Sequence, residues 1–165
     1  MRRAVLVVSL LVAGRGTAGE LTPECLIRMS RCQLLDLYHA GTAAAPPVGF
    51  VRGYPIFEPG RRLTVMRTHA TRLLWQGKEF NCQGDTMVNH VVGAKMVHAA
   101  VFPGESWFDG APTLVFDYQC TSKLFSGVRD EVREVAPGVF LGLTYLRKSG
   151  GPELAVFFVL DARPR

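Results

Sequence analysis

From residue 51 onward, apolar and polar residues alternate with a period of two, in short runs separated by glycine, proline and turn-forming dipeptides. Alternation of this kind predicts β-strands with one buried and one solvated face. The predicted strands are Val51–Phe57, Thr64–Met66, Arg72–Gln76, Met87–Val92, Lys95–Phe102, Thr113–Gln119, Val128–Val135, Val139–Leu146 and Leu154–Leu160. Because short strands follow one another with almost no helix between them, the sequence predicts a mainly β fold, an antiparallel barrel or sandwich. A meander closed into a barrel is preferred, since closure removes the sheet edges.

Between residues 20 and 45 the apolar positions recur at helical spacing instead. Thr22 is a suitable N-cap, Pro23 suits the first turn, and Gly41 can end the helix. We therefore predict one amphipathic helix over Pro23–His39, joined to the barrel by the linker GTAAAPPVG. Its apolar stripe is predicted to cover the sheet as a lid or plug, because the polar face carries too few charges for a membrane-surface helix.

The first 19 residues have the layout of a secretory signal peptide. Two arginines precede an apolar run from Ala4 to Ala13, and small residues follow it. Cleavage is predicted after Ala18 or Gly19, which implies a secreted or periplasmic protein. The run is too short for a stable membrane span, and the alternatives are a core strand or a misplaced start codon. The predicted organisation is a signal peptide over 1–19, a helix and linker over 20–45, and a barrel domain over 46–165.

Composition and charge narrow the class of protein. With 165 residues, 48% hydrophobic and 20% charged, the chain has the composition of one globular domain. The formal charge is +5, but residues 1–18 hold three arginines and no acid, so the chain beyond them carries +2. A charge of +2 does not indicate a nucleic-acid partner.

The four cysteines leave two interpretations open. Cys25 and Cys32 lie seven residues apart in the predicted helix, a rise of roughly 10 Å, so they cannot bond to each other while the helix holds. Export would permit disulfides to Cys82 and Cys120 in either of two pairings. The other interpretation is four free thiols that act as small core residues. No CxxC or CxxxH pair is present, so we expect no metal site, and no motif indicates a cofactor.

Two short motifs carry a resemblance to a known family. Residues 49–53 read GFVRG and residues 75–80 read WQGKEF, which resembles the G-x-W-R-G and W-x-G-K-x-F motifs of the GXWXG family and its companion domain of unknown function. The later segments LVFDYQ, FLGLTYL and FFVL are similar to the closing strands of that family. Val51 stands where the family has its first Trp, so a ligand contact made by that Trp does not carry over to this chain. The resemblance implies a small lipocalin-like barrel and no known reaction.

Several side chains are candidates for a ligand site. Trp75 is predicted to anchor a strand in the core, and Lys78 either snorkels to solvent or points into a cavity. The segment MVNHVVGAKMVHAAVF reads as a hairpin with a two-residue turn at Gly93-Ala94. That register pairs Asn89 with His98 on an apolar face, as either a core hydrogen bond or a ligand-orienting pair.

The segment around the Asp109-Gly110 turn adds two more candidates. Trp107 precedes the turn, in which Asp109 is a turn former, and Asp117 lies on the wetter side of the next strand. If that side faces the barrel lumen, Asp117 becomes a ligand contact. Tyr145, in the segment FLGLTYL, is a further candidate ligand contact.

The stretch VRDEVREVAPGVFLG, residues 128–142, is predicted to be a hairpin rather than an acid/base site. Alternation places Arg129, Glu131 and Arg133 on a solvent-facing side. Asp130, among valines on the other side, needs a partner such as Arg52, Lys78 or a tyrosine hydroxyl. Asp130 and Glu134 would be roughly 13 Å apart, too far for a glycosidase pair. Pro137-Gly138 is expected in a loop of three or four residues.

The sequence therefore favours an exported barrel that binds a small apolar or amphipathic molecule. The predicted ligand contacts are Trp75, Lys78, Asn89, His98, Trp107, Asp117, Asp130 and Tyr145. One alternative is an isomerase or hydrolase in which His98 or Asp130 is the general acid/base. Another is an interaction module with a fully packed barrel. The motifs of serine hydrolases, P-loop proteins, zinc proteases and dinucleotide-binding enzymes are absent.

Overall fold

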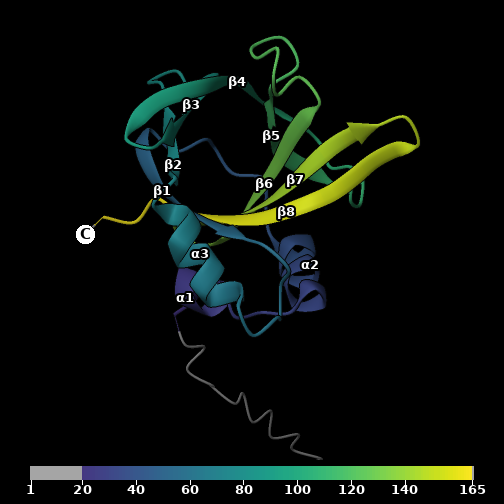
Figure 1. The fold of residues 1–165 in the computed structure, drawn as a ribbon. Helices are drawn as coiled ribbons and strands as arrows, with labels where there is room; N and C mark the ends of the chain where they lie inside the picture. The colour runs from purple at the N-terminus through teal and green to yellow at the C-terminus, as the bar shows by residue number, and fades with distance from the viewer. Residues whose placement is uncertain (1–19, 165) are drawn as a thin grey trace, which may run out of the picture.

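The computed structural model describes residues 20–164, so the predicted signal peptide over 1–19 lies outside the described residues. Eight antiparallel strands form one closed barrel in which each strand pairs with the next and the last pairs with the first (Figure 1). The strands are β1 (Gly49–Ile56), β2 (Trp75–Phe80), β3 (Thr86–Val91), β4 (Ala94–Glu105), β5 (Pro112–Asp117), β6 (Val128–Ala136), β7 (Val139–Lys148) and β8 (Gly151–Asp161). The prediction of a mainly β fold, with a meander closed into a barrel, is confirmed.

The prediction of one helix over Pro23–His39 is wrong, because two helices occupy this segment: α1 (Pro23–Leu26) and α2 (Arg31–Ala40). Residues 27–30 separate them, and Ser30 is the N-cap of α2. Its hydroxyl accepts a hydrogen bond from the Gln33 backbone N–H, and the Gln33 side chain accepts one from the Ser30 backbone N–H. This capping box starts a new helix where the apolar spacing alone suggested continuity.

The predicted strand Thr64–Met66 and most of the predicted strand Arg72–Gln76 are also wrong. A third helix, α3 (Thr64–Arg72), lies there, and β2 begins only at Trp75. Two threonines on the buried side of α3 hold it: Thr64 donates to the Glu58 carbonyl at 2.8 Å and Thr68 to the Pro55 carbonyl at 2.7 Å. Their β-branched side chains suggested a strand, but their hydroxyls dock a helix onto β1.

The Pro137-Gly138 turn is shorter than expected. Ala136 pairs with Val139, so the loop between β6 and β7 has two residues, and a bulge between Glu134 and Ala136 adjusts the register. Gly138 has a φ of 70°, which suits the second position of a Pro-Gly turn.

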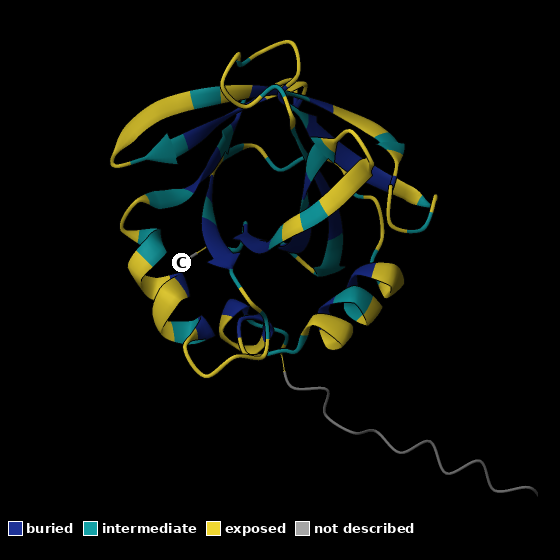
Figure 2. Cartoon of the chain, turned by 45° about the vertical axis from the view of Figure 1, so that its right-hand side comes forward, coloured by how far each residue is buried: buried dark blue, intermediate teal, exposed yellow. Residues whose placement is uncertain are grey.

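Apolar residues gather in two clusters, one on each side of the barrel wall. The inner cluster includes Phe80, Met87, Leu114, Phe116 and Phe140. The outer cluster lies between the helices and the outer faces of β1, β7 and β8, and includes Leu26, Leu34, Tyr38, Leu141, Leu143 and Phe157. In Figure 2 the helices turn exposed faces outward and buried residues toward the barrel. Among residues 20–164, no helix combines the length and apolarity that a membrane span requires.

All four cysteines are free and exposed in the structure, so the interpretation of the thiols as small core residues is wrong. The argument that Cys25 and Cys32 cannot bond because they share one helix does not apply, since Cys25 lies in α1 and Cys32 in α2. Neither of the two disulfide pairings left open by the sequence is formed.

Candidate functional site

One end of the barrel holds a pocket of about 330 Å³. Residues from the end of β1, the start of β2, the hairpin between β3 and β4, the entry to β6, and strands β7 and β8 line it. Its apolar walls include Phe57, Val91, Val97, Phe125, Val156 and Phe158. Its polar groups include six that make up what we call the Lys78 cluster: Trp75, Lys78, Asn89, Tyr118, Asp130 and Thr144.

A buried ion pair is the centre of the Lys78 cluster. Lys78 Nζ lies 3.0 Å from Asp130 Oδ2, and the two side chains are only 3% and 4% exposed. The same ammonium donates to Asn89 Oδ1 at 2.9 Å and to the Tyr118 hydroxyl at 2.7 Å. Three acceptors thus meet the three ammonium protons. Asp130 has the partners that the sequence required, a lysine and a tyrosine hydroxyl.

The remaining groups of the cluster close the network around this pair. Tyr118 donates to Asp130 Oδ2 at 2.9 Å, and Thr144 donates to Asp130 Oδ1 at 2.7 Å. Trp75 Nε1 donates to Asn89 Oδ1 at 2.9 Å. Asn89 Nδ2 in turn donates to the Val97 carbonyl at 3.0 Å and to the Tyr118 hydroxyl at 3.3 Å. Every polar side chain of the cluster is hydrogen-bonded, as buried polar groups require.

Burial and the charge of Asp130 shift the pKa values of Lys78 and Tyr118. Burial lowers the pKa of Lys78, while the adjacent Asp130 carboxylate works to raise it. Burial, reinforced by the same carboxylate, raises the pKa of Tyr118 well above its usual value, so the phenol stays neutral. Four aromatic rings surround Lys78 Nζ at 5.3–5.5 Å from their centroids: Trp75, Phe116, Tyr118 and Phe158. Their faces add an attraction for the ammonium.

The W-x-G-K segment explains how Trp75 and Lys78 reach the same pocket. Residues three apart in a regular strand point to opposite faces. The register of β2 against β3 shifts between Trp75 and Gly77, and this bulge turns both side chains inward. Gly77 has a φ of 149°, and a Cβ at this position would overlap the Val51 carbonyl, while Gly53 leaves room for the Trp75 ring.

The predicted pairing of Asn89 with His98 is wrong. The hairpin turn is Val92-Gly93 rather than Gly93-Ala94, with φ of 50° and 75°, as in a type I′ turn. A bulge at Val97 then shifts the register, so that Asn89 pairs with Met96 and His98 pairs with Val88. Val97 lines the pocket, whereas His98 is exposed and outside it. No histidine of residues 20–164 lines this pocket.

Trp107, Asp117 and Tyr145 also lie outside the pocket. Asp117 forms an ion pair with Arg147 at 2.7 Å. Trp107 and Tyr145 stack edge to face, with ring centroids 5.6 Å apart. Their packing is part of the outer surface of the barrel, and none of the three lines the cavity. Of the eight predicted ligand contacts, the structure brings together Trp75, Lys78, Asn89 and Asp130.

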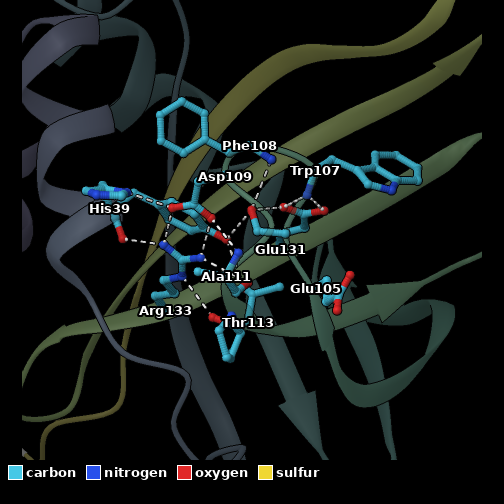
Figure 3. A network of polar contacts seen from close by, with 12 residues as sticks. His39, Glu105, Trp107, Phe108, Asp109, Ala111, Thr113, Glu131 and Arg133 are labelled. Carbon is cyan, nitrogen blue, oxygen red and sulfur yellow. Dashed lines mark hydrogen bonds and ion pairs between the residues drawn. The ribbon is translucent and has the colours of Figure 1, made fainter.

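The outer face of β6 is not the solvent-facing side that the charge alternation predicted. Glu131 is 0% exposed and Arg133 is 1% exposed. The loop between β4 and β5 covers Glu131, which accepts a hydrogen bond from Ser106 Oγ at 2.6 Å (Figure 3). Arg133 donates to both carboxylate oxygens of Asp109, at 2.6 and 2.8 Å. Asp109 is thus more than a turn former, and these contacts form a structural network separate from the pocket.

Tyr118 and Thr144 belong to the site, and the sequence did not single them out. Tyr118 continues the alternation of Leu114 and Phe116 on the inner face of β5. A tyrosine at the end of this apolar alternation indicates a buried ring whose hydroxyl needs a hydrogen-bond partner, here Asp130. Thr144 lies directly opposite Asp130 across the β6–β7 pairing, which only the strand register reveals.

No protein-family model and no curated protein matches the chain. One solved structure is similar to it, the crystal structure of a protein from Thermomonospora curvata, with a TM-score of 0.51 and 19% sequence identity. The match covers 82% of this chain and 90% of that chain. At this identity the likeness supports the barrel fold alone.

Proposed function

We propose that this protein binds a small, largely apolar molecule inside the barrel. The observation that carries the proposal is the pocket of about 330 Å³, whose apolar walls converge on the buried Lys78 cluster. Ligand pockets commonly combine such a volume and apolar lining with a few fixed polar groups. The opposite end of the barrel is filled by Phe80, Met87 and Phe140, so the space is confined to one end. This contrast argues against a fully packed interaction module.

An enzyme is the second candidate, and Asp130 with Lys78 is the feature that favours it. A buried amine whose pKa burial has lowered, next to a carboxylate and a phenol, is typical of acid/base sites. Asp130 Oδ2 is already engaged by Lys78 and Tyr118. Proton transfer to a ligand would therefore use the less occupied Oδ1. Binding needs no such step, so it stands first.

We also propose that the chain is related to the GXWXG family and is exported. Gly53 in the first motif leaves room for the Trp75 ring, and Gly77 in the second motif allows the close approach of β1 and β2. These contacts support the relationship, because they explain why both motifs contain glycine. The residue in the place of the family's Trp, Val51, points into the inner cluster. Export is tested by the N-terminus of the protein recovered from its own host. A mature chain that begins at Gly19 or Glu20 supports it, and an intact N-terminus in the cytoplasm refutes it.

Native mass spectrometry with matched tryptophan substitutions tests binding. Val156 lines the pocket, so Val156→Trp fills the cavity. Val48, 67% exposed and just before β1, provides the same substitution at the opposite end of the barrel. We expect protein from its own host to carry a small molecule in the wild type and in Val48→Trp, and to lose it in Val156→Trp. An empty wild type that also fails to bind apolar fluorescent probes would reject the proposal.

A further inference from the structure

We propose that this pocket selects uncharged ligands and rejects carboxylates and other anions, because its cation is already neutralised and fully hydrogen-bonded. This selectivity deepens the proposed binding function and rests on it. The argument follows from the charges, hydrogen-bond donors and unoccupied acceptors of the groups that line the pocket.

The charges of the lining cancel. Among the described residues that line the pocket, Lys78 is the sole basic side chain and Asp130 the sole acidic one. They lie 3.0 Å apart. An anionic ligand would therefore enter an apolar cavity without gaining a free counter-charge, while it loses its hydration. A neutral ligand meets no such penalty.

The donors of the Lys78 cluster are also used up. All three ammonium protons of Lys78 point at protein acceptors, and the Trp75 N–H is donated to Asn89. Tyr118 and Thr144 donate to the two oxygens of Asp130. Both protons of the Asn89 amide are taken as well. A carboxylate needs donors, and binding one here would break bonds that the protein already makes.

What remains free at the base of the pocket is acceptor capacity. Asp130 Oδ1 accepts from Thr144 alone, and the Thr144 hydroxyl keeps its own lone pairs. The hydroxyl of Thr71, which lines the pocket outside the cluster, can accept a further hydrogen bond and can also donate one, but it carries no charge to balance an anion. A ligand hydroxyl or N–H can donate to these oxygens without disturbing the ion pair. The ligand class is therefore an uncharged, mainly apolar molecule with a hydroxyl or N–H donor, such as a phenol or an alcohol, rather than a fatty acid.

A pair of fluorescent probes tests this selectivity. Phenylnaphthylamine is neutral and has one N–H donor, and anilinonaphthalenesulfonate adds a sulfonate to the same ring system. We expect the wild type to bind the neutral probe at least about tenfold more tightly than the anionic one, at physiological salt that screens the surface charges. Equal affinities, or tighter binding of the anion, overturn the inference.

A charge-releasing variant sharpens the test. Asp130→Asn keeps the size of the side chain but leaves the Lys78 cation without a counter-charge. We expect this variant to bind the anionic probe at least about tenfold more tightly than the wild type, and the neutral probe no more tightly, because its N–H donor loses the Asp130 carboxylate as an acceptor. Asp36→Asn, on the exposed surface of α2, removes the same charge and is expected to change neither affinity. A folded Asp130→Asn without a gain for the anion contradicts the inference.

The possible failures are distinguishable. If neither probe binds the wild type, the proposed binding function fails and the selectivity fails with it. If both probes bind alike and Val156→Trp removes both, binding stands and the selectivity alone is wrong. If Asp130→Asn does not fold, the ratio of the two wild-type affinities still decides.

Discussion

Lys78 and Asp130 depend on each other, because either one alone is an uncompensated charge in an apolar interior. Both side chains are almost completely buried, and four aromatic rings enclose the ammonium. Removing one partner of a buried pair usually costs much more than removing both, since a stranded charge keeps its full desolvation penalty. The pair is thus best examined by single and double substitutions.

We expect Lys78→Met to lower the free energy of unfolding by about 3–5 kcal/mol, because it strands Asp130. The double variant Lys78→Met/Asp130→Asn is expected to recover most of this loss, since the amide carries no charge. Urea unfolding of the wild type, both single variants and the double variant measures the coupling. Additive losses would mean that the two groups do not stabilise each other.

Among the secondary-structure elements, bulges in two strands determine which side chains reach the pocket. The shift between Trp75 and Gly77 turns Trp75 and Lys78 inward together, and the shift at Val97 removes His98 from the cavity. The alternation of the sequence predicted most strands and the inward position of Asp130. The alternation failed at the bulges, because one extra residue moves every later side chain of the strand to the opposite face of the sheet. A positive φ is unusual for a β-branched residue such as Val97. The residue type at this position therefore did not predict the bulge.

The sequence also could not show what covers the barrel. The alternating charges of β6 indicate a solvated face when the strand is considered alone. Glu131 and Arg133 are buried because a loop and α2 lie over them, which is a tertiary effect. The same holds for α3, whose threonines favour a strand locally but donate to carbonyls outside the helix, at Glu58 and Pro55.

The close approach of β1 to β2 supplies a prediction about Trp75. A Cβ at Gly53 would overlap the Trp75 ring and lie 2.9 Å from Gly77 Cα. We expect Gly53→Ala to displace the ring, lower the free energy of unfolding by about 1–3 kcal/mol and weaken binding of the neutral probe. The control is Gly127→Ala, where an added Cβ meets nothing within 4 Å. Urea unfolding and tryptophan fluorescence report both effects, and equal behaviour of the two variants would contradict the packing argument.

The loop that covers β6 supplies a prediction about pH. Hydrogen bonds from Arg133, and then from His39, hold the pKa of Asp109 below its usual value of 3.8. The unfolded chain then binds the proton more readily, so this stabilisation is complete above about pH 5, well above the unfolded pKa of 3.8, and is lost as the pH falls toward the folded pKa. We expect Asp109→Asn to cost about 2–3 kcal/mol at neutral pH. The gap between variant and wild type should narrow between about pH 5 and pH 2.

Urea unfolding across that pH range measures the Asp109 contribution, and a gap that stays constant would refute it. His39→Ala is the matched comparison. The His39 side chain is 69% exposed and lies 2.8 Å from Asp109, so its removal is expected to cost less than about 1 kcal/mol. A larger loss of unfolding free energy would mean that His39 in α2, rather than Arg133, is the main residue that holds the loop.

Taken as one molecule, the barrel is incomplete without its N-terminal helices. Leu26, Ile27, Leu34 and Tyr38 are each at most 1% exposed, and they cover the outer faces of β1, β7 and β8. Burial of such side chains contributes about 1.5–3 kcal/mol each. Together they approach the total stability of a typical domain, about 5–15 kcal/mol. The helices are therefore part of the folded core rather than an appendage.

We accordingly expect a chain of residues 20–165 to fold and a chain of residues 42–165 to be unfolded or aggregated. The shorter chain would expose Leu141, Leu143 and Phe157, which are buried in the full structure, as a large apolar patch. Circular dichroism, gel filtration and thermal melting of the two chains measure the difference. A cooperative, monomeric 42–165 barrel that still binds the neutral probe would show that the pocket needs only the strands, and that α1 and α2 serve another purpose.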